Sequence, residues 1–142
     1  MPLSTQEKAA ALARVPLFAG ISSESMARLA EATGEQDFGA GQFIVRQGQV
    51  GTGLYVVLSG SVKVVRGADE LARLGGGDFF GELSVIDQQP RNASVQAVEP
   101  TACLALASWD LLALLESDAQ LSLNLIRGLV ERVRSAGEQH RH

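Results

Sequence analysis

Two oppositely charged side chains, Glu82 and Arg91, lie within one short segment, residues 79–95. The guanidinium of Arg91 presents a planar fork of N–H donors that matches the oxygens of a phosphate. The ionised carboxylate of Glu82 only accepts hydrogen bonds, so it suits a sugar hydroxyl. The types and spacing of these residues therefore indicate a binding site for a ligand that carries both a phosphate and a ribose.

The backbone between these side chains is expected to supply further donors. Gly81 permits a tight turn that a residue with a Cβ would resist, and residues 82–85 are then predicted to form one short helical turn. The unpaired N–H groups at the start of a helix attract a phosphate. Pro90 ends this unit, because the residue before a proline is pushed away from helical geometry. Since the net charge is −4, any attraction for a phosphate must be local.

The segment resembles the phosphate-binding cassette of the cyclic nucleotide-binding domain family. That family includes the catabolite activator protein, the regulatory subunits of cyclic-AMP-dependent protein kinase and cyclic-nucleotide-gated channels. Its usual pattern is Phe-Gly-Glu-(Leu/Met)-Ala-Leu, a few variable residues, then Pro-Arg-x-Ala-x-Val. The residues that match are Phe80, Gly81, Glu82, Leu83, Pro90, Arg91, Ala93 and Val95. Ser84 and Val85 are mild departures from Ala and Leu, and the resemblance extends from Leu12 to about Val133.

The resemblance implies a role for each residue of the cassette. Arg91 would pair with the cyclic phosphate and Glu82 with the ribose 2′-hydroxyl of cAMP or cGMP. The expected ligand-binding residues are Phe80, Gly81, Glu82, Leu83, Ser84, Arg91, Asn92 and Ala93, with backbone N–H groups of Gly81, Leu83, Asn92 and Ala93 contributing. The amide of Asn92 could serve either purine, so the base is left open. No cofactor besides this ligand is expected.

Other interpretations of the same residues remain open. Glu82 and Arg91 could form a solvated salt bridge, worth at most about 1 kcal/mol and unrelated to function. The chain could be an interaction scaffold that binds no nucleotide, or the ligand-binding part of a transcription regulator, kinase, channel or transporter. A transcription regulator would need a helix-turn-helix segment after the last helix, and there is no room for one before His142. Direct binding of nucleic acid is therefore not expected.

Length and composition favour one globular domain over residues 1–142, with 46% apolar residues. Cys103 is the only cysteine, which fits a reducing, cytoplasmic compartment. No apolar run reaches the ~20 residues that span a membrane. Both histidines, His140 and His142, lie at the chain end, where a disordered tail is favoured over a weak metal site. No catalytic arrangement of Ser, Cys, His and Asp can be assembled, so no enzyme activity is expected.

The periodicity of the sequence predicts a mainly β domain, a small barrel or sandwich, between two pairs of helices, and the resemblance implies that it is a jelly-roll-like β-roll, a double-stranded β-helix. N-terminal helices are expected in residues 1–34, with a Ser4–Glu7 capping box opening a first helix through about Arg14, and a second helix stopped by Gly34. The short strands and glycine turns of residues 35–107 indicate the barrel or sandwich, which the resemblance implies to be the roll. Two C-terminal helices are expected in residues 108–137, capped by Ser108 and Asp118.

The last helix carries apolar residues in two rows. One row is Leu121, Leu125 and Leu129; the other is Ala119, Leu123, Ile126, Val130 and Val133. A helix so apolar should be covered on most sides. One row can pack on the roll, and the other needs either a second copy of the chain or the base of a bound ligand. Homodimerisation through this helix is the resulting hypothesis.

Overall fold

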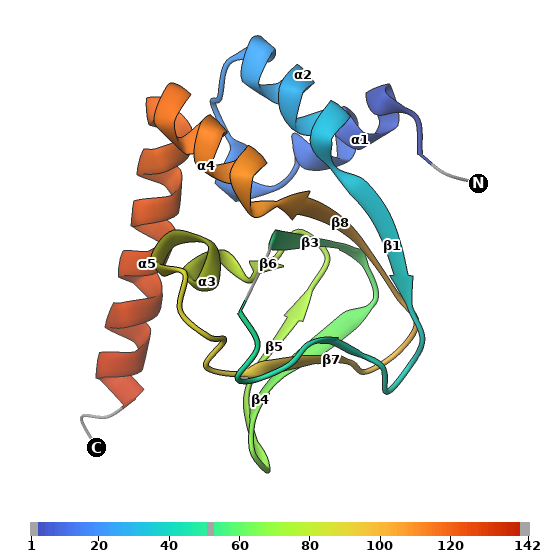
Figure 1. Ribbon diagram of the computed structural model, residues 1–142, viewed down its shortest axis with the longest axis vertical. Helices are drawn as coiled ribbons and strands as arrows, with labels where there is room; N and C mark the ends of the chain where they lie inside the picture. The colour runs from blue at the N-terminus through green and yellow to red at the C-terminus, as the bar shows by residue number, and fades with distance from the viewer. Residues whose placement is uncertain (1–2, 51–52, 140–142) are drawn as a thin grey trace.

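The strands form two four-stranded antiparallel sheets that close into a β-roll (Figure 1). This computed structural model describes residues 3–50 and 53–139, without the side chains of Leu83 and residues 136–139. The first sheet has the order β1-β8-β3-β6 and consists of β1 (Gly34–Phe38), β8 (Thr101–Ala107), β3 (Gly53–Ser59) and β6 (Phe79–Phe80). The second has the order β2-β7-β4-β5 and consists of β2 (Phe43–Val45), β7 (Ser94–Ala97), β4 (Ser61–Arg66) and β5 (Asp69–Gly75).

The hairpin turn between β3 and β4 lies at Ser59 and Gly60. Gly60 has a φ of 91°, a conformation that glycine adopts readily. A Cβ on Gly60 would also lie 2.5 Å from the carbonyl oxygen of Pro100. The turn therefore needs a glycine both for its backbone conformation and for the close approach of the β7–β8 connection.

The helices lie at one end and along one side of the roll (Figure 1). They are α1 (Thr5–Leu12), the 3-10 helix η1 (Pro16–Phe18), α2 (Ser23–Ala32), α3 (Glu82–Asp87), α4 (Ser108–Ser117) and α5 (Ala119–Gln139). In the view of Figure 1, α1, α2 and α4 cover the top of the roll, and α5 descends beside it. The short α3 projects from the roll towards α5 and belongs to the predicted cassette.

The start of α5 is fixed to the N-terminal helices by two polar side chains. The carboxylate of Asp118 accepts hydrogen bonds from Ser25 Oγ at 2.6 Å and from the N–H of Leu121 at 3.1 Å. The amide of Asn124 donates to the carbonyl oxygens of Leu17 at 2.9 Å and Ala19 at 2.7 Å. Asp118 thus caps α5 as predicted and also joins it to α2.

Two apolar clusters form the core. The larger cluster packs the helices on the first sheet, and its members include Leu12, Leu29, Leu54, Leu104 and Leu121. The smaller cluster lies inside the roll and includes Val57, Val62, Phe80, Val95 and Cys103. Burial raises the pKa of the Cys103 thiol to about 11. That thiol therefore stays protonated at neutral pH, as expected for a buried, inert cysteine.

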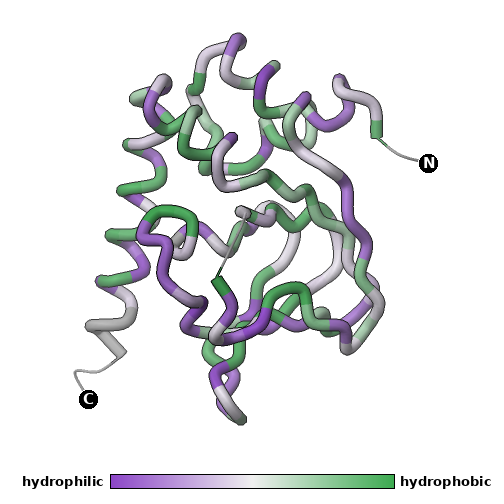
Figure 2. Tube along the Cα trace, viewed as in Figure 1, coloured by the Kyte–Doolittle hydropathy of each residue, from purple (hydrophilic) through white to green (hydrophobic). Residues whose placement is uncertain are grey.

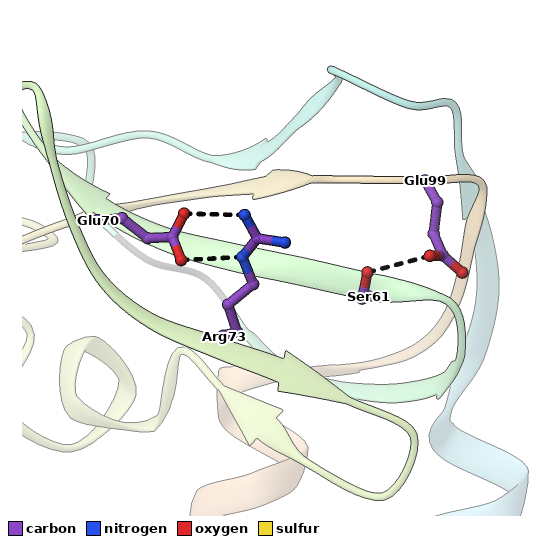
Figure 3. Close-up of polar contacts among 4 residues, drawn as sticks. All are labelled: Ser61, Glu70, Arg73 and Glu99. Carbon is purple, nitrogen blue, oxygen red and sulfur yellow. Dashed lines mark hydrogen bonds and ion pairs between the residues drawn. The ribbon is translucent and has the colours of Figure 1, made fainter.

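Polar contacts on the outer face of the second sheet are exposed. Arg73 and Glu70 on β5 form an ion pair with N–O distances of 2.8 and 3.0 Å, and Ser61 donates to Glu99 at 3.3 Å (Figure 3). An ion pair so exposed contributes at most about 1 kcal/mol to stability.

Apolar and polar residues also alternate along α5 (Figure 2).

Several predicted boundaries are wrong by a few residues. The first helix ends at Leu12 rather than Arg14, and Gly34 is the first residue of β1 rather than a helix stop, because Thr33 is already extended at ψ 141°. Ser108 is the first helical residue of α4, and Ala107 stands at the cap without a side-chain hydrogen bond. The last helix continues past Gly137 to Gln139. A single glycine inside a helix is tolerated and does not by itself end it. His140 and His142 lie outside the described residues.

Candidate functional site

Gly81 connects β6 to α3 and has a φ of 95°. A Cβ at this position would lie 2.8 Å from the carbonyl oxygen of Gly53 and 3.0 Å from Nη1 of Arg91. The space beside Gly81 is therefore filled by the guanidinium of Arg91. The positive φ agrees with the predicted tight turn at Gly81, and the group that lies beside this glycine is the arginine of the same cassette.

Arg91 is held in place through both its side chain and its backbone. Its Nη2 donates to the carbonyl oxygen of Gly53 at 3.2 Å, and its own N–H donates to the carbonyl oxygen of Gln49 at 2.7 Å. Burial lowers the pKa of the Arg91 guanidinium, and the nearby Tyr55 and Glu82 oppose this shift. A cation that is partly removed from water attracts an anion more strongly than an exposed one.

Glu82 begins α3 and is only 2% exposed. Its carboxylate does not pair with Arg91 but with Arg132 of α5. Arg132 Nη2 also donates to the carbonyl oxygen of Phe79 at 3.2 Å, and its guanidinium lies 4.7 Å from the centre of the Phe79 ring. A carboxylate this deeply buried needs such a partner. The solvated Glu82–Arg91 salt bridge considered above is therefore not the arrangement found.

Glu82 and Arg91 line the same cavity, whose volume is about 570 Å³. Its charged lining residues are Glu82, Asp87, Arg91 and Arg132, and its uncharged polar ones are Ser84, Gln89 and Asn92. Its apolar lining comes from the second sheet, with Val45, Val64, Ala72, Leu74 and Val95, and from the cassette, with Phe79, Phe80, Pro90 and Ala93. The cavity thus combines guanidinium groups, carboxylates and an apolar wall, which is the combination that a phosphate, a sugar and a flat base would need.

Comparison with known proteins assigns the chain to a family. The family model of the cyclic nucleotide-binding domain matches residues 35–118. The chain belongs to this family. The match includes both sheets except Gly34, and the whole cassette, so every residue that lines the cavity lies within the matched part except Arg132.

Named relatives show the same relationship. The cyclic AMP receptor protein of Thermus thermophilus is 39% identical over 126 residues, which covers 85% of this chain and 58% of that protein. The crystal structure of the Thermus thermophilus catabolite activator protein has a TM-score of 0.79 at 36% identity, covering 87% of this chain and 61% of that one. The regulatory domain of Toxoplasma gondii PKA, co-crystallised with cAMP, has a TM-score of 0.80 at 27% identity, covering 89% of this chain and 50% of that one. This chain therefore spans 50% to 61% of these relatives.

The structure brings almost all of the predicted site residues of this domain together. The predicted residues that line the cavity are Phe80, Gly81, Glu82, Ser84, Arg91, Asn92 and Ala93. Ser84 is buried, and its hydroxyl donates to the carbonyl oxygen of Gln89, which closes the segment between α3 and Pro90. The side chain of Leu83 lies outside the described residues, and only its position in α3 is known.

Arg132 is the site residue that sequence reasoning missed. It stands seven residues after Leu125 and three after Leu129, on the helix face that packs on the roll. A charged residue on an otherwise apolar face was the available signal, because a charge on the face that packs on the roll lies close to the buried groups there. The two predicted rows contain only apolar residues, so they did not include Arg132.

The aromatic residues behave differently from one another. Tyr55 stacks on Phe80 with ring centres 5.2 Å apart and an angle of 8° between the rings. It therefore supports Phe80 at the start of the cassette. Trp109 lies on α4 and is 69% exposed.

A second cavity of about 680 Å³ shares Ala72, Phe79 and Arg132 with the first but is lined by neither Glu82 nor Arg91.

Proposed function

We propose that this chain binds a cyclic nucleotide, cAMP or cGMP, as a regulatory module. The observation that carries the proposal is the cavity of about 570 Å³ that Glu82 and Arg91 line together. Arg91 pairs with the cyclic phosphate, and Glu82 accepts a hydrogen bond from the ribose 2′-hydroxyl. The co-crystal structure of the Toxoplasma gondii PKA regulatory domain with cAMP supports the choice of ligand.

The other cassette residues take complementary roles. The N–H groups of Gly81, Leu83, Asn92 and Ala93 donate to the phosphate, as backbone donors at a helix start and in a tight loop do elsewhere. Phe80 and Ser84 shape the floor of the site. The apolar wall formed by Val64, Leu74 and Val95 receives the base. The chain carries out no catalysis in this proposal, since its described residues contribute recognition and no reacting group.

Binding is transmitted through Arg132. This residue links the cassette carboxylate of Glu82 to α5, so a change in the position of α3 alters the contact that holds the helix. A ligand shifts the equilibrium between two positions of α5 only if it binds one of them more tightly. The contact between Glu82 and Arg132 supplies such a difference, because a hydroxyl that bonds to Glu82 changes the surroundings of the same carboxylate.

The function is tested by calorimetric titration of the chain with cAMP, cGMP and cyclic di-GMP. We expect saturable binding of one of the first two. Arg91→Ala should weaken it by about 2–5 kcal/mol, as for removal of one partner of a buried charge pair. Arg73→Ala is the matched control, because Arg73 pairs with Glu70 on the exposed face of β5. Unchanged affinity of the Arg91 variant would refute the assignment, and a chain that binds none of the three would be an interaction scaffold.

The effector remains open among the classes of protein that share this domain. The relatives include a CRP-like cAMP-activated global transcriptional regulator of Mycobacterium tuberculosis, 57% of which the match covers. A role as the sensing part of a transcription regulator is the candidate favoured by that similarity. No described helix has the length and apolarity that crossing a membrane requires. Cys103 is the only cysteine and cannot form an internal disulfide, which fits a reducing, cytoplasmic compartment.

A homodimer through α5 is the second part of the proposal. In the outer row of α5, the exposed residues are Leu123, Ile126, Val130 and Val133, with Val133 at 71%. None of them lines the nucleotide cavity, to which α5 contributes only Arg132 among the described residues. The base of a ligand in that cavity therefore does not cover this row. Their 3-4-3 spacing suits the seam of a two-stranded coiled coil, so a second copy of α5 is the occupant proposed.

A further inference from the structure

The loop from Arg91 to Ala93 has two consecutive carbonyl groups that are held from outside the cavity. The N–H of Gly48, in the turn after β2, donates to the carbonyl oxygen of Arg91 at 2.8 Å. The guanidinium of Arg66, the last residue of β4, donates through Nε to the carbonyl oxygen of Asn92 at 3.0 Å. Neither Gly48 nor Arg66 lines the cavity, whereas Asn92 and Ala93 do.

These two contacts fix the directions in which the N–H groups of Asn92 and Ala93 point. A peptide unit is planar, and in the trans form its C=O and N–H point in opposite directions; the described residues contain no cis peptide bond. Holding the carbonyl of Asn92 towards Arg66 therefore directs the N–H of Ala93 away from Arg66. The same argument directs the N–H of Asn92 away from Gly48. Within the described part of the chain, neither N–H has an acceptor.

We propose that Arg66 is a positioning residue, which presents the N–H of Ala93 to the anion bound beside Arg91. It acts through the Asn92–Ala93 peptide unit and does not touch the ligand. This inference rests on the proposed function, since it assigns a device to the same phosphate site. Two adjacent N–H groups that converge beside a guanidinium form an anion-binding concavity. Gly48 orients the N–H of Asn92 in this concavity, and Arg66 orients the N–H of Ala93.

The first test compares the affinity for cAMP of the wild type, Arg66→Ala, Arg66→Lys and the control Arg73→Ala. Loss of one hydrogen bond that orders a donor should weaken binding by about threefold to tenfold in Arg66→Ala. Arg66→Lys should be intermediate, because an ammonium on a flexible stem keeps the charge but not the planar fork. Arg73→Ala should stay within about twofold of the wild type. An Arg66→Ala affinity equal to that of the wild type would overturn the proposal.

A second measurement separates positioning from the simple loss of a nearby positive charge. The two phosphorothioate diastereomers of cAMP each replace a different exocyclic oxygen by sulfur. If Arg66 orients one donor, Arg66→Ala should change the ratio of their affinities by about threefold or more. A pure charge effect would weaken both diastereomers equally and would fade at high salt. An unchanged ratio, with the deficit removed by salt, would therefore contradict the positioning role.

Backbone 15N relaxation in the ligand-free chain distinguishes this inference from the proposed function. The order parameters of the Asn92 and Ala93 amides should be lower in Arg66→Ala than in the wild type, because the contact that orients their peptide unit is lost, while those of the β3–β8 ladder should not change. This result is expected whether or not a cyclic nucleotide binds, because the contact to Asn92 is present without a ligand. If the wild type binds no cyclic nucleotide, the proposed function fails and relaxation alone decides whether Arg66 orders this loop. Equal order parameters in both proteins would reject that role.

Discussion

The carboxylate of Glu82 and the guanidinium of Arg132 form an ion pair across fifty residues of chain. The two partners differ in exposure, because the side chain of Glu82 is 3% exposed and that of Arg132 is 46% exposed. Glu82 therefore depends on Arg132 for its charge to be tolerated, whereas Arg132 could be solvated without it. This asymmetry makes the pair a connection between the cassette and α5 that a change at Glu82 can release.

A double-mutant cycle on this pair should give a clear coupling energy. We expect Arg132→Ala to lower the free energy of unfolding by about 1–3 kcal/mol, because it leaves a buried carboxylate unpaired. In the Glu82→Gln background the same substitution should lower the free energy of unfolding by an amount that is smaller by at least about 1 kcal/mol. Urea unfolding followed by circular dichroism measures all four proteins. Additive effects of the two substitutions would show that the contact contributes nothing to stability.

Glu82 should also discriminate between ribose and deoxyribose. Glu82→Ala is expected to weaken cyclic nucleotide binding less than Arg91→Ala does, and to narrow the preference for cAMP over its 2′-deoxy analogue, because the acceptor for the hydroxyl is gone. Calorimetry with both nucleotides measures the two affinities. Arg132→Ala should be titrated in parallel to separate loss of the acceptor from release of α5. A wild-type chain that binds both nucleotides equally would show that the role given to Glu82 is wrong.

Gly81→Ala should damage the site more than its backbone strain alone explains. An added Cβ would meet the carbonyl oxygen of Gly53 at 2.8 Å and the guanidinium of Arg91 at 3.0 Å. Gly67→Ala is the matched control, because Gly67 also has a positive φ, 61°, but nothing lies within 4 Å of its Cβ position. Both variants should lose about 1–2 kcal/mol of stability through strain. Only Gly81→Ala should also lose nucleotide affinity, and equal affinities in the two variants would contradict the packing argument.

Charged residues in the outer row of α5 should dissociate the proposed dimer. The double substitution Ile126→Glu and Val133→Glu places like charges in the seam and removes apolar contact between the helices. Glu131→Arg, which is exposed and lies about 120° around the helix from the outer row, is the control. Analytical ultracentrifugation should show a dimer for the wild type and the control, and a monomer for the double variant. A wild type that sediments only as a monomer at high concentration would remove the dimer hypothesis.

Asp118 should make the attachment of α5 sensitive to acid. Hydrogen bonds from Ser25 Oγ and then from the N–H of Leu121 lower the pKa of the Asp118 carboxyl. In the unfolded chain this group titrates near its ordinary value of about 3.9. Its contribution to stability is therefore fully present above that value and is lost as the pH falls through the lower pKa of the folded state.

The measurement compares the wild type with Asp118→Asn, in which the side chain can still cap α5. The difference between their unfolding free energies should be constant around neutral pH and should shrink below about pH 4. Thermal or urea unfolding at several pH values provides it. A difference that stays the same down to about pH 3 would show that the Asp118 charge is not what stabilises the junction.

The sequence by itself determined the cassette, because its information is local. Gly81, Pro90 and Arg91 each impose a backbone or chemical constraint that holds wherever the segment lies. The turn at Ser59 and Gly60, the caps at Ser4 and Asp118, and the alternation of the strands follow from the same short-range rules. The mainly β fold with flanking helices could therefore be predicted, with errors only at boundaries such as Gly34 and Ser108.

Only the tertiary structure decided which groups meet across the chain. The pairing of Glu82 with Arg132, the hold of Gly53 on Arg91 and the hold of Arg66 on Asn92 join residues far apart in sequence. No local rule selects these partners, since each depends on how α5, β3 and β4 pack around the cassette. The physical reason is burial: it removes Glu82 from water, and the nearest cation that the fold provides then becomes its partner.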